Sequence, residues 1–156
     1  MNENVISNSE DVARVLFYPS FFNLESSPFF SEGVLSPIAF KLQILKSGKP
    51  ESSISVLRTL VETFIHDVAK LFPRNNDDLK CGYALLNVGE VREIRIPSTH
   101  NLDIEVVPTG SKRLRSHAEI VLRLDGKVLT AVDEPLEVIR FRKTLARLAS
   151  KRIVRL

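Results

Sequence analysis

The amino-acid sequence predicts a single α+β domain with a mixed or antiparallel sheet. Three observations favour this class: segments that alternate apolar and polar residues, an Asp-Gly pair between two apolar runs, and two segments with apolar residues at helical spacing. The chain has 156 residues, 44% hydrophobic and 26% charged, which suits one globular core. We expect residues 1–10 to be flexible, residues 11–156 to form the domain, and its two main helices to pack on one face of the sheet.

The first part of the chain predicts two strands separated by a loop rich in phenylalanine. Residues 12–18 are apolar apart from one arginine, which favours a strand and leaves a short helix as the alternative. Residues 19–37 combine proline and serine with four phenylalanines, which predicts a loop anchored by its rings. Phe29 and Phe30, if exposed together, would form a surface for self-association. Residues 38–44 alternate in character and predict a second strand.

The middle of the chain predicts the first main helix. Residues 54–58 form a short strand or the start of a helix. Residues 59–72 follow as a helix, because Thr59 and Glu62 have the spacing of a capping box and apolar residues recur at helical spacing after them. Residues 83–86 are apolar and predict a buried strand.

The last part predicts a hairpin and the second main helix. Asn87 and Glu90 are placed to cap a short helix, and residues 103–107 read as a strand. Within residues 118–132, an Asp-Gly pair joins two apolar runs, which is typical of a tight hairpin turn. Residues 135–152 form a basic amphipathic helix that begins at a proline, a residue tolerated in the first helical turn.

The positive charge of the chain is concentrated in this final helix. Residues 140–155 contain seven lysines and arginines and no acid, whereas the whole chain carries a net charge of +3. Such a helix predicts contact with nucleic acid or an acidic protein, and the alternative is an ordinary solvated face. The candidate polyanion-binding residues are Arg140, Lys143, Arg147 and Lys151 on the helix, with Lys112, Arg113 and Arg115 in an earlier loop.

Three polar residues at the ends of predicted strands are the candidate catalytic set: Arg58, Arg92 and His117. Two guanidinium groups and an imidazole in one cleft would suit a phosphate-bearing substrate, with the histidine as acid or base. The alternative is a separate structural role for each. Cys81 is the only cysteine, which excludes a multi-thiolate zinc site, and we find no metal-binding or cofactor-binding motif. The sequence therefore favours a binding protein over an enzyme.

Several short segments carry a resemblance to a known group of proteins. In order along the chain they are Ser55-Val56-Leu57-Arg58, Gly82-Tyr83-Ala84, Val88-Gly89-Glu90-Val91-Arg92, Val107-Pro108 and His117-Ala118. This order resembles a loose group of short bacterial proteins without an assigned function, over residues 38–125. The resemblance implies a bacterial or mobile-element origin and a common site for the three candidate catalytic residues.

The cellular location is predicted from two further features. The first residues are polar, without the basic start and apolar run of a signal peptide. No apolar stretch has the length of a membrane span. We therefore expect a cytoplasmic protein that does not enter a membrane.

Overall fold

The computed structural model describes residues 4–23 and 34–156 and confirms the α+β class. The elements, in chain order, are β1 (Asp11–Tyr18), the 3-10 helix η1 (Pro37–Phe40), β2 (Ile54–Arg58), α1 (Phe64–Lys70), β3 (Leu79–Asn87), α2 (Val88–Arg92), β4 (Leu102–Pro108), β5 (His117–Leu124), β6 (Lys127–Val128), α3 (Leu136–Ser150) and β7 (Ile153–Arg155).

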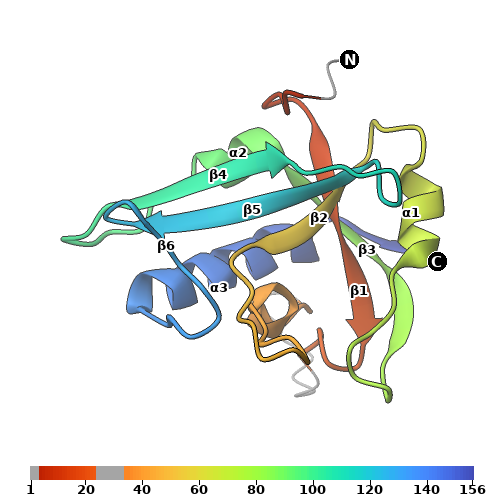
Figure 1. Ribbon diagram of the computed structural model, residues 1–156, viewed down its shortest axis with the longest axis horizontal. Coiled ribbons are helices and arrows are strands. Elements are labelled where there is room, and N and C mark those ends of the chain that lie inside the picture. Colours follow the sequence, from red (N-terminus) through yellow and green to blue (C-terminus); the bar gives the residue numbers. More distant parts are fainter. Residues whose placement is uncertain (1–3, 24–33) are drawn as a thin grey trace.

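The strands of the described residues form one antiparallel sheet of seven strands (Figure 1). Six follow the order β4-β5-β2-β1-β3-β7, and β6 pairs with β5. β7 is not predicted from the sequence; its three residues begin after Lys151 and Arg152, which follow the end of α3. β7 packs closely on β3, because a Cβ on Gly82 would lie 2.2 Å from the carbonyl oxygen of Val154. Glycine at this position therefore permits the edge pairing.

β1 and β2 pair over a short length only. The register consists of Val12 opposite Arg58 and Ala13 opposite Leu57. Figure 1 shows the two strands meeting near one end and separating toward the other. β1 instead pairs with β3 along its whole length, from Asp11 to Tyr18. The centre of the sheet is therefore split between β1 and β2.

The two main helices lie on opposite faces of the sheet rather than on one face. α3 belongs to the main core, together with Val12 and Leu16 of β1. α1 belongs to a smaller core on the other face, with Ala13 and Val15. Both sets of β1 side chains are apolar, so each face of this strand needs its own cover. A half-buried strand has one buried and one solvent-exposed face, and both helices would then cover the same face. β1 is buried on both faces, so one helix covers each.

The first main helix is shorter than predicted. α1 spans Phe64–Lys70, and its N-cap is Thr63. Thr59 forms no capping box, because its hydroxyl donates to the carbonyl oxygen of Asp11 (3.0 Å). Its backbone N–H donates to the same oxygen and extends the pairing of β1 with β2. Phe64 is buried, but Ile65 is 61% exposed, since a helix of two turns with one apolar side buries only a narrow stripe.

The predicted strand at residues 38–44 is wrong. Residues 37–40 form η1, and Ser36 caps it by accepting a hydrogen bond from the backbone N–H of Ile38. Ser36 followed by Pro37 is a helix-start signal, which outweighs the alternating pattern. Ile38 and Ile44 are exposed, whereas Phe40 is buried against α3.

Other predicted elements are confirmed. Residues 12–18 and 54–58 are strands, and Asn87 caps α2 by accepting from the N–H of Glu90. The hairpin between β5 and β6 turns at Asp125 and Gly126, which have φ values of 50° and 85°. Both belong to the left-handed region that this type of turn requires.

Part of the segment before β1 is buried, and part of the phenylalanine-rich loop lies outside the described residues. Before β1, Ile6 is buried in the main core and Glu10 is buried beside Arg58. Phe29 and Phe30 lie outside the described residues. No helix in residues 4–23 and 34–156 is long and apolar enough to cross a membrane.

Candidate functional site

Arg58, the first candidate catalytic residue, is enclosed in the protein. It is 1% exposed and forms a two-pronged ion pair with Glu10, through Nε to Oε1 (3.1 Å) and Nη2 to Oε2 (2.9 Å). Burial raises the pKa of Glu10, but the hydrogen bonds from Arg58 and from the N–H of Ser7, with the charges of Arg58 and Arg92, outweigh it and lower the pKa overall. The charge of Arg58 is therefore balanced within the fold.

The other two members of the set have local partners. Arg92 donates to the side chain of Asn8 (2.7 Å) and to the carbonyl oxygen of Val106 (3.2 Å). Nδ1 of His117 is hydrogen-bonded to the hydroxyl of Thr109 (2.7 Å).

The structure brings two of the three candidates together. Arg58 and His117 line one cavity of about 540 Å³, beside Lys112 and Arg115, and Arg92 does not line it. Arg92, one of the two arginines expected to bind a phosphate, is therefore absent from this cavity. Arg58, the other arginine, is already paired with the carboxylate of Glu10, so the cavity does not hold two free guanidinium groups and an imidazole as expected.

The cationic loop between β4 and β5 is fastened to α1. The backbone N–H and hydroxyl of Ser116 both donate to Oδ2 of Asp67, at 3.0 and 2.6 Å. Lys70 donates to the carbonyl oxygen of Arg113 (2.6 Å). Burial raises the pKa of Asp67, but hydrogen bonds from Ser116 and Thr63 and the charge of Lys70 lower it overall. The loop therefore lies beside α1.

The cations of α3 form a separate surface. α3 packs on the opposite face of the sheet from α1, so its charges do not adjoin the cationic loop. Arg142 is buried and pairs with Glu134 (3.2 Å). The outward cations of the helix are all exposed, and in the described part of the chain none of them forms an ion pair: Arg140, Lys143, Arg147 and Lys151.

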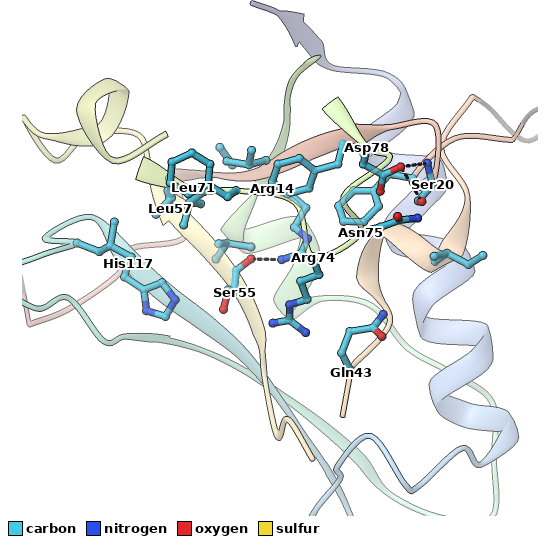
Figure 2. A pocket seen from close by; sticks show the side chains of 18 residues that line it. Arg14, Ser20, Gln43, Ser55, Leu57, Leu71, Arg74, Asn75, Asp78 and His117 are labelled. Carbon is cyan, nitrogen blue, oxygen red and sulfur yellow. Dashed lines mark hydrogen bonds between the residues drawn. The ribbon is translucent and has the colours of Figure 1, made fainter. Parts of the chain in front are cut away.

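A largely apolar hollow lies where β1 and β2 separate. This pocket, which we call the β1–β2 pocket, has a volume of about 420 Å³ (Figure 2). Leu57 of β2, Phe17 of β1 and Leu71 after α1 form an apolar end, and Phe72 and Ile38 stand at its rim. The lining therefore combines both sheet edges with the segment that follows α1.

The opposite end of the pocket is polar. Asp78 is buried there and accepts from the N–H and the hydroxyl of Ser20, at 3.3 and 2.9 Å. Gln43 and Arg74 complete this end, and the guanidinium of Arg74 forms a two-pronged ion pair with Glu51 (2.9 and 2.6 Å). These charged groups are thus already satisfied within the protein.

Arg14 is the exception among the charged groups of the pocket. Figure 2 shows its side chain reaching from β1 toward Ser55 of β2. Nη1 donates to the carbonyl oxygen of Ser55 and Nε to that of Ala39, both at 2.8 Å, while Nη2 takes part in no described hydrogen bond. Arg14 forms no ion pair with a carboxylate of the described residues, since Glu51 is bound to Arg74.

The surroundings of Arg14 disfavour its charge. Burial lowers its pKa to about 10, an effect that the charge of Glu51 opposes and that of Arg74 reinforces. The ring of Phe21 stacks on the guanidinium, with 5.4 Å between its central carbon and the ring centre. The group stays protonated at neutral pH, so it is a partly buried cation whose Nη2 has no hydrogen-bond acceptor among the described residues.

Comparison with known proteins adds no relative: no family model, curated protein or solved structure matches the chain. No cluster of metal-ligating side chains occurs among residues 4–23 and 34–156. The β1–β2 pocket is not predicted from the sequence. The signal available was a lone arginine, Arg14, inside an otherwise apolar strand.

Proposed function

We propose that this protein is a non-catalytic binding protein and that the β1–β2 pocket holds its ligand. The ligand has an apolar body and a carboxylate, and the carboxylate pairs with Arg14. The observation that carries the proposal is the half-buried guanidinium of Arg14, which has no carboxylate partner in the described chain and one nitrogen without a hydrogen bond.

The energetics of Arg14 support an anionic ligand. A charged group withdrawn from water is costly unless it is paired and hydrogen-bonded. Two backbone carbonyl oxygens satisfy part of the guanidinium of Arg14, and neither carries a full negative charge. A carboxylate facing Nη2 would supply both the missing charge and the missing acceptor.

The shape of the pocket supports an apolar body. Its volume of about 420 Å³ is in the range of small-ligand sites. The side chains of Phe17, Leu57 and Leu71 offer contact to a hydrocarbon group, and contact with them is favourable at about 25 cal/mol per Å² of apolar surface buried.

The proposal is tested by mapping NMR signals of the full chain during addition of octanoate at neutral pH. The backbone signals of Val15 and Ser55 and the Nε–H signal of Arg14 should move together and saturate. Acetate, which lacks the apolar body, and 1-octanol, which lacks the charge, are the matched controls and should move them far less. Equal effects of octanol and octanoate, or shifts spread over unrelated surfaces, would contradict the proposal.

The outward face of α3 supports a second binding function, directed at nucleic acid. Four exposed cations, Arg140, Lys143, Arg147 and Lys151, share this face without an ion pair in the described residues. Cations in such a row attract phosphates without regard to base sequence, and binding of this kind weakens steeply with salt.

Titration of duplex DNA at several salt concentrations tests this second function. Four phosphate contacts predict a log–log slope of about −3 to −4, and Arg147→Gln should flatten it by about one unit. Absence of any salt-dependent binding at low ionic strength would contradict it. Binding of poly-glutamate in place of DNA would instead indicate an acidic protein as the partner.

A small enzyme for phosphate-bearing substrates is the alternative function. Arg58 and His117 share a cavity, which is the observation in its favour. The pairing of Arg58 with Glu10 weighs against it, because a phosphate would have to displace a buried carboxylate.

A further inference from the structure

The backbone of β1 directs hydrogen-bonding groups toward the β1–β2 pocket that pair with no strand of the described residues. The N–H of Thr59 donates to the carbonyl oxygen of Asp11, so Asp11, Ala13 and Val15 direct their backbone groups toward β2. The pairing of the two strands ends at Ala13 opposite Leu57. Val15 therefore directs its N–H and carbonyl oxygen toward the opening, where no strand in residues 4–23 and 34–156 pairs with them.

The facing edge of β2 also extends past the paired region, and a side chain occupies one of its backbone groups. The N–H of Arg58 donates to the carbonyl oxygen of Ser116, so Arg58 and Val56 direct their backbone groups toward β5. Leu57 and Ser55 consequently face β1. The carbonyl oxygen of Ser55 is bound by a side chain, Nη1 of Arg14, where a sheet would normally supply a backbone N–H.

We infer that the ligand of this pocket is the C-terminal end of an extended peptide, which pairs with Val15 as an added strand and places its terminal carboxylate at Arg14. This inference rests on the proposed function and names the class of ligand. Addition of a strand to an open sheet edge provides affinity through backbone hydrogen bonds, and side-chain pockets provide selectivity.

The pocket is closed at the end where β1 and β2 pair, which favours the end of a peptide over an internal peptide segment. β1 and β2 are paired at Ala13 and Leu57, one residue before Arg14. A peptide that enters from the open end meets this closed apex and has no path onward between the strands. Its last residue then lies beside the guanidinium of Arg14, which complements the charge of a terminal carboxylate.

The rim of the pocket suits a chain longer than the cavity itself. Phe72 is 75% exposed and Ile38 is 51% exposed, although both line the pocket. Exposed apolar side chains next to a hollow are typical of surfaces that a partner covers. The residues of the peptide before its end would contact these two side chains.

Calorimetric titration with synthetic peptides tests the inference on the full chain. The probe is a short peptide with serine in its first half and leucine or valine in its last half. We compare its free acid, its C-terminal amide and a form N-methylated at the bonds that would donate to Val15. The acid should bind about tenfold more tightly than either modified peptide, because each lacks one charge-assisted or backbone hydrogen bond.

A pair of surface variants supplies a control for non-specific apolar binding. Phe72→Ser should weaken binding of the peptide acid severalfold, because Phe72 lies at the rim. Ile65→Ser should leave it unchanged, since Ile65 is similarly exposed, at 61%, and does not line the pocket. Their high exposure leaves folding unaffected.

The outcomes separate this inference from the proposed function. If octanoate binds and the peptide acid binds no more tightly than its amide or N-methylated form, the inference that the ligand is a peptide is wrong, and the proposed carboxylate-binding pocket remains supported. If neither octanoate nor the peptide acid binds, both fail. Tight binding of the acid alone among the peptides supports both.

Discussion

Glu10→Gln tests whether Arg58 is a structural residue. The substitution keeps the shape of the side chain and removes the charge that faces Arg58, which is 1% exposed. Of the two hydrogen bonds from the guanidinium, at 3.1 and 2.9 Å, only one can persist, because the amide has a single acceptor oxygen and its NH2 group cannot accept. Breaking a buried ion pair on one side costs about 3–5 kcal/mol. With an m-value of about 2 kcal/mol/M, a loss of about 4 kcal/mol lowers the midpoint of urea unfolding by about 2 M.

The assay is urea unfolding followed by circular dichroism, with a double variant as control. Glu10→Met combined with Arg58→Met removes both charges, and its stability should recover most of the loss, because the unpaired charge is gone. The pKa of Glu10 is lowered in the fold, so its stabilising effect is present above its ordinary pKa and is lost as the pH falls through the lowered value. A loss below about 1 kcal/mol in Glu10→Gln would refute the structural role and return Arg58 to the candidate catalytic set.

Two further predictions concern the α1 side of the sheet. Phe64→Ala should lower the free energy of unfolding by about 3–5 kcal/mol in the same urea assay, because Phe64 is 7% exposed and packs on Tyr83; a change below 1 kcal/mol would place α1 outside the core. Asp67→Asn should cost about 2 kcal/mol or more at neutral pH, because Ser116 donates twice to that carboxylate. The pKa of Asp67 is lowered in the fold, so the difference from the unsubstituted protein should shrink as the pH falls through that value, and a difference independent of pH would contradict the role of its charge.

Elements with local signals could be predicted from the sequence. The hairpin depends on Asp125 and Gly126, whose conformations follow from residue type alone. The cap of α2 depends on Asn87, three residues before its bonding partner. The strand predicted at residues 38–44 failed because two signals conflicted, and the Ser-Pro start of η1 prevailed over alternation.

Features that depend on distant contacts could not be predicted. The pattern within residues 12–18 shows that the strand is apolar on both sides but does not say which helix covers which side. The β1–β2 pocket lies where strand pairing stops at Ala13, and its lining includes Ile38 of η1 and Leu71 after α1, which are distant from β1 in the sequence. Arg14 was visible as a polar residue in an apolar strand, but its lack of a carboxylate partner is a property of the fold.

Of the candidate residues named from the sequence, the structure relates few to one another. Arg58 and His117 share a cavity, whereas Arg92 is held elsewhere by Asn8. The charge pattern located the exposed face of α3 because helical periodicity alone places those residues on one side. The same pattern gave no sign that the cationic loop would be fastened to α1 on the opposite face of the sheet.

The affinity of octanoate for Arg14→Gln, relative to 1-octanol, tests the central claim most directly. Arg147→Gln is the matched control, because it removes the same charge from an exposed site on α3. A charge-assisted hydrogen bond is worth about 1.5–3 kcal/mol, so calorimetry should show a preference for octanoate over 1-octanol of about tenfold or more in the unsubstituted protein and in Arg147→Gln. In Arg14→Gln, with folding verified by circular dichroism, this preference should disappear. An equal preference in both variants would contradict the assignment of the pocket to a carboxylate ligand.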